Sequence, residues 1–148
     1  HSVKNGIEAL SDAVDLIAIQ DGVRPFASKE MILRLVDCAP KNGSAIPVVK
    51  AIDSYRMVEG EESHIIDRSP LRIVQTPQIF DARLLKAAYS LPYEESFTDD
   101  ASVVQAYLSK NPEEKSRVCY VPGEKFNLKL TTPDDMLLAE AILSLISK

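Results

Sequence analysis

Polar and charged side chains follow the apolar runs of this 148-residue sequence at several separate points. Together they offer hydroxyl groups, arginine forks, a lysine ammonium and carboxylates, a set that suits a phosphorylated, hydroxyl-bearing substrate and a divalent metal. These residues are Asp21, Arg24, Ser54, Arg56, Arg68, Thr76, Gln78, Thr98, Asp99 and Lys129. Phosphoryl and nucleotidyl transfer require mainly positioning and charge neutralisation, so the lack of a G-x-S-x-G or Cys/His arrangement does not exclude this chemistry.

Most of these residues also have a purely structural explanation, and the sequence leaves both readings open. Asp21 could be a turn residue that forms a surface ion pair with Arg24. Arg56 and Arg68 could be edge-strand charges that prevent aggregation. The segment Thr98–Asp100 could be a simple helix cap. Each explanation is reasonable alone, but the candidates gather at expected strand ends and in one arm.

Lys129 is the hardest of these residues to explain structurally. It lies within the apolar segment "FNLKL" (126–130), which predicts a strand. An unpaired ammonium buried in such a strand would be costly, so a functional role is favoured. In open parallel sheets, ligands bind beyond the carboxyl ends of the strands, where most of the candidates fall.

The elements that must position these residues alternate between strands and helices. This order predicts an α/β fold with a sheet that is parallel in large part. Ser28, Asp81 and Thr132 are the predicted helix caps, and Thr76-Pro77 interrupts one strand. We expect strands at 16–19, 43–49, 72–80, 117–123 and 126–130, and helices at 3–10, 28–40, 82–90, 99–110 and from 132 onward.

The segment from about residue 50 to 72 differs from the rest of the chain. It alternates apolar and polar residues, turns around Glu59-Gly60-Glu61 and lacks the apolar run that a core requires. This pattern predicts a β-hairpin arm that projects from the body.

Composition excludes several classes of protein. A hydrophobic content of 45%, a charged content of 26% and a net charge of −5 are typical of a soluble globular domain and argue against nucleic-acid or anionic-membrane binding. No apolar run approaches the roughly 18 residues of a membrane span. Cys38 and Cys119 form no CxxC motif or Cys/His cluster, so we expect reduced core thiols in a cytoplasmic protein and no zinc site.

The segments "DGVRP", "IPVVKAIDSYR", "DRSPLRIVQTPQIF", "FTDDASVV" and "NLKLTTPDD" resemble the 2-C-methyl-D-erythritol 4-phosphate cytidylyltransferase family over nearly the whole chain. The resemblance implies a Rossmann-like α/β nucleotidyltransferase fold and a homodimer whose β-arms embrace. It also implies transfer of a cytidylyl group from CTP to methylerythritol phosphate, with Mg²⁺ as cofactor and pyrophosphate as the second product. This reaction belongs to non-mevalonate isoprenoid biosynthesis.

The resemblance also implies a role for individual residues. Asp21 would lie by the metal and the nucleotide phosphates, Gly22 near the ribose, and Ser2 at the serine of the family's nucleotide-side R-x-x-S-V motif. Arg68 and Lys129 would position the substrate phosphate for attack on the α-phosphorus of CTP. The implied substrate-binding residues are Arg24, Ser54, Thr76, Thr98 and Asp99. The arm residues would reach the active site of the partner subunit.

Two departures from the family pattern qualify this expectation. Ser54 stands where threonine is common, which keeps the hydroxyl group. The Gly-rich A-A-G-x-G-x-R loop, the P-K-Q motif and the arginine upstream of Ser2 are absent from the sequence. We therefore expect residues 1–148 to form a single cytidylyltransferase domain without its N-terminal part, inactive on its own.

Three alternatives remain open. A ribitol 5-phosphate cytidylyltransferase has the same fold and the same CTP chemistry. A receiver-type signalling module carries Asp, Thr and Lys at successive strand ends, an order that Asp21, Thr76 and Lys129 imitate. A catalytically dead dimerisation fragment is the third alternative.

Overall fold

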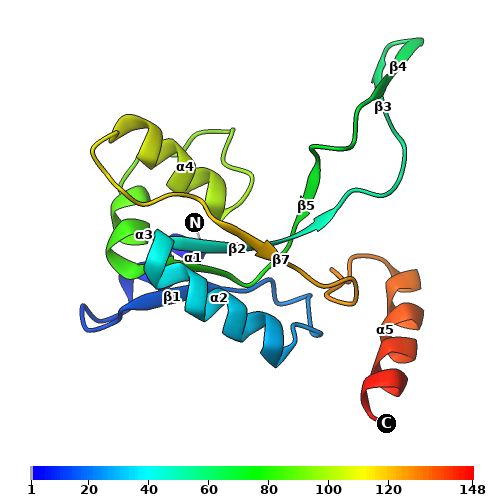
Figure 1. The fold of residues 1–148 in the computed structure, drawn as a ribbon, viewed down its shortest axis with the longest axis horizontal. Coiled ribbons are helices and arrows are strands. Elements are labelled where there is room, and N and C mark those ends of the chain that lie inside the picture. Colours follow the sequence, from blue (N-terminus) through cyan, green and yellow to red (C-terminus); the bar gives the residue numbers. More distant parts are fainter. Residues whose placement is uncertain (1) are drawn as a thin grey trace.

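The computed structural model describes residues 2–148 as a mixed sheet covered by helices, with a long hairpin extending away from it (Figure 1). The helices are α1 (Ser2–Glu8), α2 (Lys29–Asn42), α3 (Ala82–Ala88), α4 (Asp100–Lys110) and α5 (Pro133–Ile146). The strands are β1 (Leu16–Ile19), β2 (Ser44–Lys50), β3 (Tyr55–Glu59), β4 (Glu62–Ile66), β5 (Arg72–Val74), β6 (Gln78–Asp81) and β7 (Tyr120–Pro122). None of the helices in this part of the chain is long and apolar enough to cross a bilayer.

The main sheet has the strand order β1-β6-β2-β5, with β7 paired to β2. The expectation of a largely parallel sheet is wrong. Among the described strands, β2 and β7 are parallel, whereas β1–β6, β2–β6 and β2–β5 are antiparallel. The physical reason is the arm: the chain leaves β2 through a hairpin excursion and returns directly, so β5 and β6 run opposite to β2 without a helical crossover.

Successive side chains of each strand point to opposite faces of the sheet, and this produces two hydrophobic cores, one on each face. Phe80 of β6 and Ile46 of β2 are buried on the face covered by α3 and α4. Their neighbours Ile79 and Ala45 are buried on the other face, against Leu35 of α2. The two inner strands are therefore apolar on both faces, while their ends are free to carry polar groups.

Helix α2 begins as predicted and ends later than predicted. The backbone N–H of Met31 donates to Ser28 Oγ at 3.1 Å, which confirms the N-cap. The helix does not end near 38–40 but continues through Pro40 to Asn42. Proline is tolerated here because the last turn is closed by other groups: the N–H of Gly43, at φ 85°, donates to the Ala39 carbonyl at 2.8 Å.

The segment 126–130 is not a strand, which corrects a second prediction. Asn127 is fully buried and Phe126 is largely exposed, the reverse of what its apolar pattern indicated. The Asn127 N–H closes a turn on the Glu124 carbonyl at 3.1 Å, and the Leu130 N–H donates to the Val23 carbonyl at 2.8 Å. Side chains and loops satisfy this backbone, so it has no need of a strand partner.

The arm, residues 50–72, ends in a hairpin of β3 and β4, which pair in antiparallel register from Tyr55↔Ile66 to Glu59↔Glu62. Gly60 lies in the tight turn with a φ of 62°, as the sequence pattern predicts for this position. The hairpin extends well beyond the sheet in Figure 1, and among the described elements its two strands pack substantially only on each other. Its side chains are mostly exposed, so the hairpin has no core of its own.

Candidate active site

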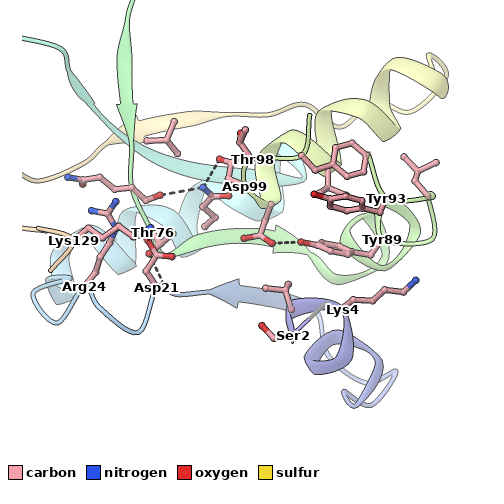
Figure 2. Close-up of a pocket in the computed structure, with 18 residues that line it drawn as sticks. Ser2, Lys4, Asp21, Arg24, Thr76, Tyr89, Tyr93, Thr98, Asp99 and Lys129 are labelled. Carbon is pink, nitrogen blue, oxygen red and sulfur yellow. Dashed lines mark hydrogen bonds and ion pairs between the residues drawn. The ribbon is translucent and has the colours of Figure 1, made fainter. Parts of the chain in front are cut away.

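Most of the predicted site residues line one cavity of about 630 Å³, shown in Figure 2. The predicted residues in its lining are Ser2, Asp21, Arg24, Thr76, Gln78, Thr98, Asp99 and Lys129. They come from α1, from the segment after β1, from the bend between β5 and β6, from the start of α4 and from the loop after β7. The fold therefore brings together residues that are far apart in the sequence, from Ser2 to Lys129.

Charges gather at one end of the cavity, around Asp21 (Figure 2). Arg24 Nε lies 3.0 Å and Lys129 Nζ 3.7 Å from Asp21 Oδ2. With two cations on one carboxylate, this cluster keeps a net positive charge and is suited to an anion such as a phosphate. Lys129 differs from its prediction: its side chain is 50% exposed and ion-paired, so no buried ammonium has to be explained.

Arg24 is held more firmly by the protein than the sequence analysis supposed. Its side chain is only 11% exposed, and Nη1 donates to the Asn127 carbonyl at 2.7 Å while Nε binds Asp21. The reading in which Arg24 pairs with Asp21 is therefore correct, although the pair lies in the cavity wall and is not a solvent-exposed surface pair. The guanidinium joins the turn after β1 to the loop after β7.

Thr76 supports the same acid from the other side. Its Oγ1 accepts the backbone N–H of Asp21 at 2.9 Å, and the residue is 8% exposed. The peptide bond between Thr76 and Pro77 is cis. The hydroxyl can still donate its own proton into the cavity.

Three buried amide side chains connect the loops of the site. Gln75 exchanges two hydrogen bonds with the backbone of Glu124, at 2.8 and 3.1 Å. Asn127 Nδ2 donates to the Thr76 carbonyl at 2.8 Å. Gln78 Nε2 donates to Asp99 Oδ2, and Gln78 Oε1 accepts the N–H of Ala101, both at 3.0 Å.

Gln75 and Asn127 are functional candidates that the sequence reasoning missed. The available signal was the presence of amides inside otherwise apolar segments, where a polar side chain must find partners. Gln75 and Asn127 fix the β5–β6 bend to the loop after β7, and Gln78 fixes it to the start of α4. These three segments carry Thr76, Asp99 and Lys129.

Asp99 has the structural role that the sequence left open. It is the N-cap of α4, accepting the Ser102 N–H at 2.8 Å in a capping box. Its second carboxylate oxygen is bound by Gln78. Thr98, immediately before it, also lines the cavity, so α4 presents its N-terminal end to this space.

The opposite end of the cavity is aromatic and was not predicted (Figure 2). The hydroxyl of Tyr89 donates to Asp100 Oδ1. Burial raises the pKa of the Asp100 carboxyl, and burial together with the Asp100 contact raises the pKa of Tyr89. Tyr93 and Phe97 stack edge to face with ring centroids 6.3 Å apart.

Four predicted residues lie outside this cavity, namely Gly22 and the three arm residues Ser54, Arg56 and Arg68. Ser54 and Arg68 are on the exposed arm, where Arg68 Nη1 lies 3.4 Å from Ser54 Oγ. Gly22 follows Asp21 but does not line the cavity, and a Cβ at this position would meet no atom within 4 Å. Among residues 2–148, therefore, nothing close to position 22 requires a glycine there.

The donor set around Asp21 accommodates a divalent metal only in part. Residues 2–148 contain no group of three or more His, Cys, Asp or Glu side chains that could hold a metal ion. Oδ2 of Asp21 faces the two cations, and no described residue forms a hydrogen bond with Oδ1. Mg²⁺ commonly takes one carboxylate together with waters and substrate phosphates, so Asp21 fits it when phosphates supply the other ligands.

Comparisons with known proteins agree on one family. The family model described as 2-C-methyl-D-erythritol 4-phosphate cytidylyltransferase matches residues 1–145. A protein of that name from Phocaeicola vulgatus is 41% identical over 143 residues, which cover 97% of this chain and 62% of the relative. One from Bacillus pumilus is 41% identical over 145 residues, covering 96% of this chain and 60% of the relative. The chain thus spans about three fifths of the length of these relatives.

Solved structures give the same result. The crystal structure of 2-C-methyl-D-erythritol 4-phosphate cytidylyltransferase from Thermus thermophilus matches with a TM-score of 0.80 and 34% identity, over 97% of this chain and 68% of that one. The 4-diphosphocytidyl-2C-methyl-D-erythritol synthase from Anaerococcus prevotii matches with a TM-score of 0.80 and 30% identity, over 97% of this chain and 63% of that one. Both the sequence and the arrangement of the elements are therefore similar to those of this family.

Proposed function

The chain belongs to the 2-C-methyl-D-erythritol 4-phosphate cytidylyltransferase family, and we propose that it forms part of an enzyme that transfers a cytidylyl group from CTP to 2-C-methyl-D-erythritol 4-phosphate. The products are 4-diphosphocytidyl-2-C-methyl-D-erythritol and pyrophosphate, in non-mevalonate isoprenoid biosynthesis. The observation that carries this proposal is the cavity in which Asp21, Arg24 and Lys129 form a cluster with net positive charge. We also propose a cytoplasmic location, because both substrates are phosphorylated, water-soluble molecules.

The two cations of the cluster have different tasks in this proposal. Arg24 is fixed by Asp21 and by the Asn127 carbonyl, so it provides a stationary positive charge in the wall. Lys129 is half exposed and only loosely paired at 3.7 Å, so its ammonium can move from Asp21 to an incoming phosphate. It would hold the methylerythritol phosphate while one phosphate oxygen attacks the α-phosphorus of CTP.

Asp21 would act on the metal in this proposal, and Thr76 would hold Asp21 in place and contact the substrate. Asp21 would direct Oδ1 towards a Mg²⁺ ion, which when bound neutralises charge on the nucleotide phosphates. Thr76 holds the backbone at Asp21 in place and can offer its hydroxyl proton to the substrate. Thr98 and Asp99 would contact the substrate at the start of α4, and Ser2 and Gly22 would lie on the nucleotide side.

The arm suggests a homodimer. Ser54 and Arg68 lie on the exposed hairpin outside the cavity, and the arm exposes large apolar side chains at Ile52, Val58 and Ile65. Such a surface is favourable to cover with a second protein surface. We propose that each arm lies on the partner subunit and that Ser54 and Arg68 complete the partner's cavity, where Arg68 binds the substrate phosphate together with Lys129.

The test uses a fusion of this chain to the remaining part of the Phocaeicola vulgatus relative, joined where the relative's own sequence continues. Pyrophosphate release is measured with CTP, Mg²⁺ and either methylerythritol phosphate or ribitol 5-phosphate. We expect turnover with methylerythritol phosphate and none with the 148-residue chain alone. Turnover with ribitol 5-phosphate only would assign the alternative substrate, and a folded fusion that is inactive with both would contradict the proposal.

A further inference from the structure

Cys38 and Cys119 lie side by side although they are 81 positions apart in the sequence. Their Sγ atoms are 3.5 Å apart, one on α2 and the other directly before β7. Both are free thiols, but they are only partly buried, which corrects the expectation that they lie in the core. The fold thus places side by side two thiols that form no CxxC motif in the sequence.

The surroundings of the pair favour sulfur–sulfur chemistry over metal binding. A zinc site needs about four ligands, and residues 2–148 hold no group of three metal-ligating side chains. The neighbour of the pair is Asn42, whose Nδ2 donates to Cys38 Sγ at 3.4 Å. Burial and the adjacent Cys119 thiol raise the pKa of Cys38, so little of this side chain is thiolate at neutral pH and its reactions as a nucleophile are slow.

We propose that Cys38 and Cys119 are a modification site that forms a reversible intramolecular disulfide by exchange with a low-molecular-weight disulfide. One cysteine thiolate attacks a sulfur of the reagent, whose S–S bond breaks to release one thiolate. The second cysteine thiolate then attacks the protein sulfur of the mixed disulfide and expels the other half of the reagent. The two cysteines lose two electrons and two protons, and the reagent is reduced to two thiols.

The geometry requires little movement for this reaction. A disulfide bond is about 2.05 Å long, so the two sulfurs must approach by roughly 1.5 Å, a distance that small side-chain rotations can supply. Cys38 lies in α2 and Cys119 directly precedes β7, and these two elements already pack together because α2 covers the sheet face that includes β7. Partial exposure of both side chains gives the reagent access.

The disulfide would reinforce a junction that the chain already fastens by polar contacts. Glu124, in the loop after β7, accepts from Ser28 Oγ at 2.7 Å and from Arg34 Nη2 at 3.2 Å, both on the α2 side. That loop continues to Lys129. A covalent link between α2 and the residue before β7 would therefore add a second connection between α2 and β7, at the opposite end of the strand from this loop. It would also stabilise the fold, because it closes a long loop and so restricts the conformations of the unfolded chain.

The experiment uses the 148-residue chain in glutathione buffers that range from fully reduced to fully oxidised. We expect both thiols to be lost to alkylation together, the intact mass to fall by two hydrogen atoms, and a non-reduced digest to join the Cys38 and Cys119 peptides. The melting temperature should rise by about 10 °C on oxidation and return on reduction. None of these readouts involves a nucleotide, so they are independent of the proposed enzymatic function.

Cys38→Ser and Cys119→Ala are the matched controls. Each should form at most a mixed disulfide with glutathione and show no rise in melting temperature on oxidation. Each control keeps one thiol and so cannot form the intramolecular disulfide. If one variant folds poorly, the digest of the wild-type chain still shows whether the two cysteines are paired. Two thiols that stay reactive in fully oxidised buffer, glutathione adducts on both cysteines, disulfide-linked dimers, or a lower melting temperature of the oxidised chain would each overturn the proposal.

Discussion

The wall of the cavity and the arm are held in opposite ways. The wall segments, residues 21–24, 75–78 and 124–129, are connected by short and mostly buried bonds such as Arg24 Nη1 to the Asn127 carbonyl at 2.7 Å. The arm residues Ser54 and Arg68 are exposed and joined by one contact of 3.4 Å. The chain therefore organises its wall by itself, whereas few contacts of this chain hold the arm in place.

The largest expected effects test whether the two regions serve one reaction. Arg68→Ala on the arm and Lys129→Ala in the wall should each lower kcat/KM of the fusion protein by about 100-fold, since each would remove a charge that we propose holds the attacking substrate phosphate. Steady-state pyrophosphate release measures this loss. Arg72→Ala, an exposed arginine at the base of the arm, is the control and should remain close to wild type.

Mixing these two variants sharpens the comparison. If the arm acts on the partner's cavity, a heterodimer of the Arg68→Ala and Lys129→Ala chains contains one intact site. An equal mixture that exchanges subunits freely should then recover about a quarter of the wild-type activity. No recovery, in a mixture where subunit exchange is verified by mass, would place Arg68 in the cavity of its own chain and exclude the shared site.

The next effect concerns the buried amides of the wall. Gln78→Ala should lower the free energy of unfolding by about 2–3 kcal/mol, because it leaves Asp99 Oδ2 and the Ala101 N–H without a partner and opens a small cavity. Urea denaturation of the 148-residue chain measures this change. Gln105→Ala on the exposed face of α4 is the matched control and should have almost no effect.

Removing one hydroxyl from each region compares them directly. Thr76→Val keeps the shape of the side chain but deprives the Asp21 N–H of its acceptor, so we expect a loss of about 1–2 kcal/mol in the free energy of unfolding. Ser54→Ala on the arm should change it by less than about 0.5 kcal/mol. Equal losses in the free energy of unfolding for the two variants would contradict the conclusion that the cavity wall is held more firmly than the arm.

The smallest effect is a pH dependence at the far wall of the cavity. Burial raises the pKa of Asp100 above its ordinary value of 3.8, so the folded chain binds this proton more tightly than the unfolded chain. The contribution of Asp100 to stability is therefore full below that value and is lost as the pH rises through the raised pKa. Asp100→Asn, whose amide oxygen can still accept from Tyr89, removes this loss.

Chemical denaturation at several pH values measures the Asp100 effect. The variant should gain stability relative to wild type as the pH rises from about 3 to neutral. Asp134→Asn, an exposed acid in the first turn of α5, controls for the loss of a charge at a helix N-terminus and should show no such gain. A difference between Asp100→Asn and wild type that does not change with pH would contradict the assignment.

Much of the local structure was predictable because its signals act over a few residues. β1 at 16–19, the caps Ser28 and Asp81 and the hairpin turn at Gly60 were all found where the sequence indicated them. A cap is decided by one side chain and the backbone three residues on, so neighbouring residues contain the necessary information. The segment 126–130 was misread because its buried residue is Asn127, which is stabilised by partners about 50 positions away.

The residues that line the cavity were predictable in part, and the bonds between them were not. The sequence alone determined which polar residues follow the apolar runs, and Asp21, Thr76 and Lys129 do meet in one cavity because the ends of neighbouring strands and loops converge there. Only the tertiary structure decided that the sheet is mainly antiparallel, that Arg24 is fixed by Asp21, and that Cys38 lies beside Cys119. These features depend on contacts between distant segments, whose direction and distance are set by packing and not by the spacing of residues along the chain.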